Sequence, residues 1–143
     1  MTQARGRTLA AMGWAVIVLL ALAACENQQA IQRSRVSGKP AAYCVTAQQL
    51  VDEYNANRAV ADRKYKGRVL QVSGTVTTIS EDVMNHVFIT LCTDKSGLDC
   101  VQCYFADSER ARIADLRRRQ PVQVKGLCDG KRMDVSLNGC ELQ

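Results

Sequence analysis

The sequence predicts a mainly β domain: a small barrel of five strands, with one helix before them and a second helix between the third and fourth strands. The stretch 69–79, VLQVSGTVTTI, alternates along its length and carries Gly74 at its centre, as a strand does where it bends hard. The runs 87–92 and 100–105 alternate in the same way, and a polar loop with the letters DKSG separates them. A long bent strand followed by a hairpin predicts closure into a barrel.

The first 24 residues have the layout of a secretory signal, with two arginines near the start and an apolar run after them. The run ends in LAAC at 22–25. This ending resembles the signal of bacterial lipoproteins, which implies cleavage before Cys25 and a lipid on that cysteine. An uncleaved membrane helix is the weaker alternative, because the apolar segment 9–24 has only 16 residues, whereas a spanning helix needs about 20.

Residues 25–42 are expected to form the lipidated cysteine and a flexible polar tether, and residues 43–143 the folded domain. The resemblance implies a protein that is attached by its lipid to the bacterial cell envelope and faces the periplasm. Glu26, directly after the cysteine, favours the outer membrane over the inner membrane. Cleavage removes two arginines and no acid, so the net charge falls from +5 to +3, which is no signature of nucleic-acid binding.

A helix is predicted at the start of the domain. Thr46 is expected to cap it, and Gln49 lies three residues on, as in a capping box. The apolar face of this helix consists of Leu50, Tyr54, Ala61 and Tyr65. We expect the helix to end before Gly67 and to pack across the barrel.

The hairpin 87–105 has a register that its apolar residues determine. If the turn is centred on the serine of the DKSG loop, each inward apolar residue of one strand faces an apolar residue of the other. On the opposite side, Phe88 then faces Tyr104, and Cys92 faces Cys100. Opposed cysteines on antiparallel strands can reach disulfide geometry, so we predict a Cys92–Cys100 disulfide.

The last third of the chain completes the predicted order. A second helix is expected over 107–119 and ends before Pro121. The segment 122–124 marks a fourth strand, 128–131 a turn, and 133–137 a fifth strand. This is the layout of an OB-fold, a five-stranded Greek-key barrel with a helix between strands 3 and 4.

Five stretches of the domain resemble, in sequence and in order, the bacterial OB-fold family called tRNA_anti-like. They are TAQQLVDEYNANRAVADRKYKG, VLQVSGTVTTI, VQCYF, VKGLCDGK and VSLNGCEL. The resemblance implies an OB-fold lipoprotein and carries over no set of catalytic residues. The family name records a similarity to anticodon-binding domains and does not by itself imply binding of tRNA.

Six cysteines remain besides the lipidated one, and an even number in an exported chain favours disulfides over metal. Cys100 and Cys103 have half of a zinc-ribbon spacing, but there is no second such pair and only one histidine, so we expect no metal and no cofactor. Cys103, Cys128 and Cys140 fall on cysteines that recur in the family. We expect a Cys128–Cys140 bridge in the last hairpin, although simple register does not place the two opposite each other; Cys44 and Cys103 are left paired or free.

The side chains give no pattern of catalysis. His86 stands alone, and the sequence has no phosphate-binding loop and no nucleophile with a base at a recognisable spacing. Cys100 and Cys103 lie three residues apart on a predicted strand, so their side chains point to opposite faces and do not form a redox pair. We therefore predict that the protein is not an enzyme.

OB-folds bind ligands on the face of strands 2 and 3 and on the adjoining loops. The candidate residues for this face are Phe88, Thr90, Gln102, Tyr104, Lys131 and Arg132. The aromatic pair can stack a base or a sugar; the alternatives are a pair that only stabilises the sheet, or one that the first helix covers. The flanking loops differ in charge, with Glu81 and Asp82 on one and Lys131 and Arg132 on the other.

These observations predict a membrane-anchored envelope lipoprotein whose OB-fold is a non-catalytic binding or structural module. The alternative is binding of nucleic acid or oligosaccharide through the face of strands 2 and 3. The expected partners are the membrane, through the lipid on Cys25, and an envelope protein or glycan. Nucleic acid is the less favoured partner, because the envelope holds little RNA.

Overall fold

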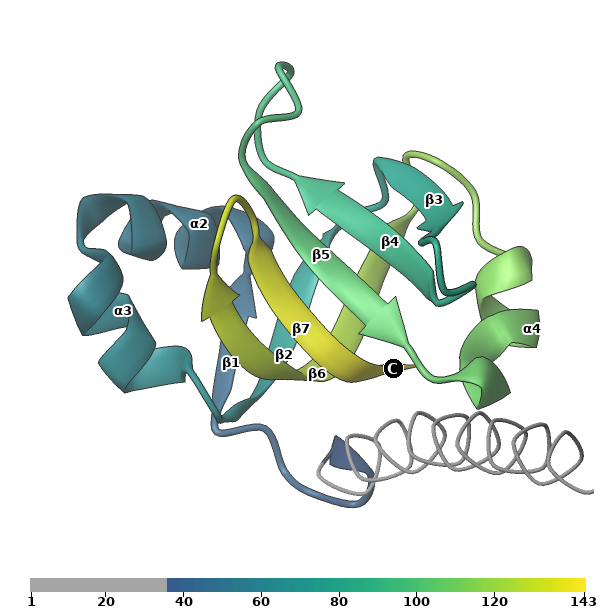
Figure 1. The fold of residues 1–143 in the computed structure, drawn as a ribbon, viewed down its shortest axis with the longest axis horizontal. Coiled ribbons are helices and arrows are strands. Elements are labelled where there is room, and N and C mark those ends of the chain that lie inside the picture. Colours follow the sequence, from purple (N-terminus) through teal and green to yellow (C-terminus); the bar gives the residue numbers. More distant parts are fainter. Residues whose placement is uncertain (1–35) are drawn as a thin grey trace, which may run out of the picture.

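A computed structural model of the chain describes residues 36–143 (Figure 1). The predicted signal at 1–24, the lipidated Cys25 and most of the tether lie outside the described residues. Among residues 36–143, no helix is both long and apolar enough to cross a bilayer.

The described residues form seven strands and three α-helices. In chain order they are β1 (Tyr43–Thr46), α2 (Ala47–Ala56), α3 (Arg58–Tyr65), β2 (Val69–Thr75), β3 (Thr78–Glu81), β4 (Val87–Cys92), β5 (Cys100–Phe105), the 3₁₀ turn η1 (Asp107–Glu109), α4 (Arg110–Ala114), β6 (Pro121–Lys131) and β7 (Val135–Leu142). All strands belong to one sheet in the order β1-β2-β6-β7-β5-β4-β3. The sheet is strongly curved, with α2 and α3 at one end and α4 at the other (Figure 1).

The prediction of a mainly β domain is confirmed, but the sheet has seven strands in an open order rather than the five of the predicted closed barrel. One additional strand is β1, which pairs in parallel with β2. The other arises because the long strand predicted over 69–79 is interrupted at Val76 and Thr77. The amide of Val76 donates to Gln120 (2.9 Å), whereas the amide of Thr77 donates to Thr90 (2.8 Å). The chain therefore changes partners here, so β2 pairs with β6 and β3 pairs with β4.

The prediction that Gly74 forms the bend is wrong. Gly74 lies within β2 and pairs with Val122, two residues before the interruption. Its role is close packing, because a Cβ atom at this position would lie 3.2 Å from the Cβ atoms of Ala47 and Leu91. A residue without a side chain lets the start of α2 and the end of β4 approach β2 closely.

The first helix is two helices. The Oγ1 atom of Thr46 accepts a hydrogen bond from the amide of Gln49 (3.1 Å), as the predicted cap requires. Asn57 ends α2 and starts α3, because its Oδ1 atom accepts a hydrogen bond from the amide of Val60 (3.2 Å). The predicted apolar face is nevertheless correct, since Leu50, Tyr54, Ala61 and Tyr65 are all buried in the core.

The predicted register of the hairpin is confirmed. Leu91 pairs with Val101 and Ile89 with Cys103, and all four side chains are fully buried. On the other side of the same strands, Phe88 pairs with Tyr104 and Cys92 with Cys100. The structure contains the Cys92–Cys100 disulfide.

The second helix and the last hairpin differ from the prediction. The α-helix covers only Arg110–Ala114, and the residues after it form turns in which Arg119 has a positive φ of 69°. Strand β6 continues through the predicted turn at 128–131, helped by two irregularities in its pairing with β7. The turn is therefore at 132–134.

The predicted Cys128–Cys140 bridge is wrong, because the shifted turn places Cys128 opposite Leu137. The Cys128 thiol contacts the hydroxyl of Tyr54 (3.6 Å) and is buried. Cys103 and Cys140 are also buried thiols, and Cys44 is an exposed thiol on β1.

We predict that Gly74→Val destabilises the domain by about 1–3 kcal/mol, because its side chain must displace Ala47 and Leu91. Gly74→Ala is expected to have a smaller effect. Thermal and urea unfolding followed by circular dichroism measure the change. Ser73→Val is the matched control, because Ser73 lines an open groove on the same strand. If Gly74→Val were as stable as the parent, the close packing of α2 and β4 on β2 would be contradicted.

Candidate ligand-binding face

Four predicted site residues lie together on the outward side of β4 and β5, and we call them the aromatic face: Phe88, Thr90, Gln102 and Tyr104. Phe88 pairs with Tyr104 and Thr90 with Gln102 across the two strands. The rings of Phe88 and Tyr104 are 5.3 Å apart between centroids and are inclined by 35°. All four side chains are half-buried. Alternation along each strand produces this arrangement, since their neighbours in sequence point into the core.

A chain of hydrogen bonds holds the polar part of this face in place. The hydroxyl of Tyr104 donates to Oε1 of Gln102 (2.9 Å), and Nε2 of Gln102 donates to Oδ2 of Asp134 (2.8 Å). The other carboxylate oxygen of Asp134 accepts from the amide of Cys100 (3.3 Å). Asp134 was missed from the sequence because the turn was expected at 128–131, which assigned this residue to a strand. The observed turn places it beside the aromatic face.

The face is acidic at both ends. Burial raises the pKa of Tyr104, and the negative charges of Asp82 and Asp134 raise it further. Asp82 lies in the loop after β3, where its carboxylate accepts from the amides of Met84 (2.8 Å) and His86 (2.9 Å) and contacts the His86 ring (3.0 Å). Burial alone would raise the pKa of Asp82, but these bonds outweigh it and lower the pKa. Asp82 therefore stays ionised at neutral pH.

Of the two predicted basic residues, Lys131 is directed away from the aromatic face. The ammonium of Lys131 donates to Oδ1 of Asn55 and lies 3.5 Å from a carboxylate oxygen of Asp99. Its charge is thus directed toward the end of α2 and is neutralised there. Arg132 lies exposed in the turn, where its amide donates to the carbonyl of Asp134 (3.1 Å).

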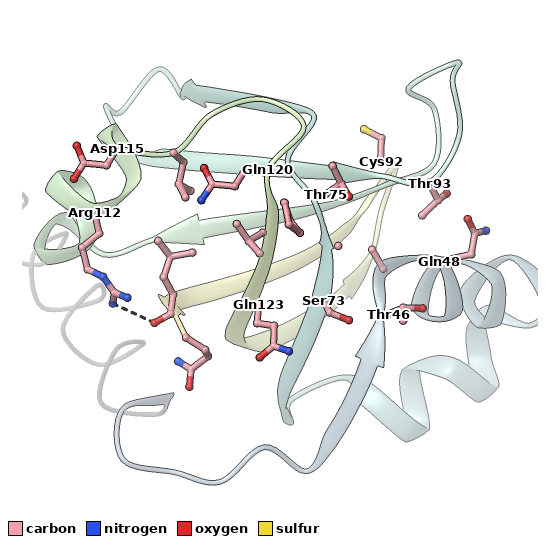
Figure 2. A pocket seen from close by; sticks show the side chains of 17 residues that line it. Thr46, Gln48, Ser73, Thr75, Cys92, Thr93, Arg112, Asp115, Gln120 and Gln123 are labelled. Atoms are coloured by element: carbon pink, nitrogen blue, oxygen red, sulfur yellow. Dashed lines mark hydrogen bonds between the residues drawn. The ribbon is translucent and has the colours of Figure 1, made fainter.

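A groove of about 950 Å³ lies on a different surface, between the ends of β2 and β6, the start of α2 and the region of α4 (Figure 2). Uncharged polar side chains dominate its lining, among them Gln48, Gln120 and Gln123. Its Arg112 already donates to the carbonyl of Leu142 (3.1 Å) and pairs with Glu109. Without an aromatic ring, and with Arg112 already paired, this groove offers a ligand less than the aromatic face does.

A metal site needs several ligating side chains close together. Within the described range 36–143, no three His, Cys, Asp or Glu side chains lie close enough to hold a metal ion. His86 lies at the edge of the aromatic face, bonded to Asp82.

The sequence matches the family described as tRNA_anti-like over residues 1–142. The chain belongs to the tRNA_anti-like family. A comparison with curated protein sequences finds no match. Among solved structures, this tRNA_anti-like protein is similar to a lipoprotein of Klebsiella pneumoniae with a suggested nucleic acid-binding role, at 14% identity and a TM-score of 0.58; the similarity covers 70% of this chain and 90% of that one. It is also similar to the OBody AM3L09 bound to hen egg-white lysozyme, at 18% identity and a TM-score of 0.42, covering 55% of this chain and 84% of that one.

The likeness to the Klebsiella lipoprotein indicates an OB-like fold for the tRNA_anti-like protein. At this level of identity it carries no residue of a site from one protein to the other. The assignment of the ligand face therefore rests on the side chains of this chain.

We predict that Asp134→Asn lowers the pKa of Tyr104, because one of the two negative charges that raise it is removed. The pKa should remain above its ordinary value, since burial is the larger cause. An NMR titration of the tyrosine ring carbons measures the shift. Asp129→Asn is the control, because Asp129 is not among the groups that act on Tyr104. An unchanged Tyr104 pKa in Asp134→Asn would show that the turn does not hold Asp134 beside the face.

Proposed function

We propose that this tRNA_anti-like protein is a non-catalytic binding module, attached to the bacterial envelope by a lipid on Cys25, that holds its ligand on the aromatic face. The pairing of Phe88 with Tyr104 is the observation that carries the proposal. Two neighbouring rings on an outward sheet surface offer a flat apolar platform. Ordered polar groups beside them, Gln102 and Asp134, supply hydrogen bonds in fixed directions.

The proposal treats β2 and β3 as two halves of the first strand of an OB barrel. The two halves follow each other in the chain but lie near opposite ends of the sheet order. There β2 pairs with β6, and β3 pairs with β4. Strands β4 and β5 are then the second and third strands of the barrel. OB-folds use this pair for ligands together with the loops before the second strand and before the fifth. Asp82 and Asp134 lie in these two loops, which supports the assignment of the face.

The charge of the face favours an uncharged oligosaccharide. Sugar rings stack on aromatic side chains through their apolar faces, and their hydroxyl groups donate hydrogen bonds to carboxylates and amides. A polyanion would instead approach the acidic side chains of Asp82 and Asp134, while the ammonium of Lys131 is paired elsewhere. Nucleic acid remains the second candidate, because the same rings can stack bases.

Calorimetric titration of the protein with an N-acetylglucosamine oligomer tests the proposal. We expect Tyr104→Ala and Phe88→Ala to weaken binding about ten-fold or more, because each removes a stacking ring. Tyr104→Phe keeps the ring and should bind more tightly than Tyr104→Ala. Gln71→Ala is the control, because Gln71 lies on β2 and bonds to Gln123, away from the face.

A single-stranded oligonucleotide at low salt is the second probe in the same experiment. Oligonucleotide binding that weakens with salt and is lost in Tyr104→Ala would favour the nucleic-acid function over the glycan function. Binding of either probe that is unaffected by all three face variants would overturn the assignment of the site.

The lipid anchor has a test of its own. We expect Cys25→Ser to abolish incorporation of a labelled fatty acid and to release the protein from the membrane fraction, because the lipid has no other attachment point in the proposal. Cys44→Ser is the matched control, because Cys44 is an exposed thiol within the folded domain. If Cys25→Ser remained acylated and membrane-bound, lipidation at this residue would be excluded.

A further inference from the structure

Two of the buried thiols lie together inside the domain. Cys103 is on β5 and Cys140 is on β7, which are neighbouring parallel strands. Cys103 pairs with Leu137, Phe105 pairs with Cys140, and an irregularity between these pairs brings the two cysteines toward each other. Neither residue has any exposed surface, and the neighbouring Cys103 thiol adds to the effect of burial in raising the pKa of Cys140.

The surroundings keep the Cys140 thiol in this position. Its sulfur donates to the carbonyl of Leu137 (3.4 Å) and lies directly over Gly126 of β6, where a Cβ atom would approach it to 2.6 Å. Gly126 therefore provides the space that the thiol occupies. A side chain there would push the sulfur of Cys140 away from its present place.

Other pairings fit the structure less well. Cys92 and Cys100 already form a disulfide. The thiol of Cys128 contacts the hydroxyl of Tyr54, and Cys44 is exposed on β1. Among the thiols of the described residues, Cys103 and Cys140 are thus the two that lie buried beside each other on paired strands.

We propose that Cys103 and Cys140 are a site of oxidation and form a second disulfide that joins β5 to β7. Each thiol loses a proton and an electron as the sulfur–sulfur bond forms. An external disulfide, such as oxidised glutathione or the disulfide of a thiol oxidase, accepts both electrons and both protons and becomes two thiols. In the cell the reaction rests on the export that is part of the proposed function, because disulfides persist in oxidising compartments.

The reaction occurs before β7 docks on β5. Thiol–disulfide exchange requires access to a thiolate, and burial raises the pKa of the Cys140 thiol well above its usual range. In the folded protein both thiols are therefore inaccessible, and that of Cys140 is protonated. A protein that folds with these thiols reduced keeps them reduced, whereas one that folds with an oxidant present acquires the bond.

Refolding of the full chain tests the inference without export or ligand. The reduced, denatured protein is refolded with a mixture of reduced and oxidised glutathione, alkylated in denaturant and digested with trypsin without reduction. Cys100 and Cys103 fall in one tryptic peptide, 96–110. We expect a species of three linked peptides, 69–95, 96–110 and 133–143, with Cys44 and Cys128 alkylated.

Two results of the same digestion would overturn the inference. One is peptide 133–143 alkylated on Cys140 while 69–95 is linked to 96–110. The other is a link from 133–143 to 126–131, which would mean a Cys128–Cys140 bridge. The variant Cys92→Ala/Cys100→Ala removes the remaining ambiguity, because a link between 96–110 and 133–143 in it must come from Cys103.

Thermal unfolding of this variant gives an independent readout. Cys103→Ala and Cys140→Ala, each added to it, should lower the melting temperature of the oxidised protein by similar amounts, about 10 °C. Removing both should add little, since either change already abolishes the bond. Cys128→Ala is the matched buried control. Added to the same variant, it should leave unchanged the drop in melting temperature that follows denaturation and reduction. If the melting temperatures of the parent variant refolded with and without glutathione were equal, the two thiols would not be joined.

Discussion

The interruption at Val76 and Thr77 is the constraint on which the rest of the sheet depends. Within two residues the backbone stops pairing with β6 and begins pairing with β4. Two backbone bonds hold Val76 there, one to Gln120 and one from the amide of Arg119 (2.7 Å), and Arg119 adopts a left-handed conformation to make it. Because β3 pairs with β4 and β4 pairs with β5, this change of partner determines where the outward surface of the hairpin lies relative to β6 and β7.

The candidate site combines a rigid platform with two adjoining loops that each contribute a carboxylate. The disulfide between Cys92 and Cys100 and the paired strands fix the spacing of the rings. The loops at either end contribute Asp82 and Asp134, and the ammonium of Lys131 is paired with Asp99. The ligand class thus follows less from the fold, which many unrelated OB domains share, than from which side chains its loops present.

Local patterns predicted what local interactions determine. Alternation fixed the register of β4 and β5, because a slip by one residue would turn every apolar side chain outward. The end of α2 depended on one side chain, Asn57, whose capping role competes with helix continuation and is not visible in the apolar spacing. Asp134 and Lys131 were misplaced because the position of the last turn depends on how far β6 follows its distant partners β2 and β7. Pairings of that kind leave no mark in the residues near the turn.

The order of strands in the sheet also has a consequence for the time at which the fold can appear. Strands β3, β4 and β5 pair with one another through short loops and can form early. Strand β2, however, needs β6 as its antiparallel partner, and β5 needs β7. These two pairings therefore cannot form until the last part of the chain has been synthesised. During synthesis from the N-terminus, the partly made chain therefore presents two separate groups of strands with unpaired edges. Residues 121–142 join them, and a chain that stops before those residues cannot complete the sheet.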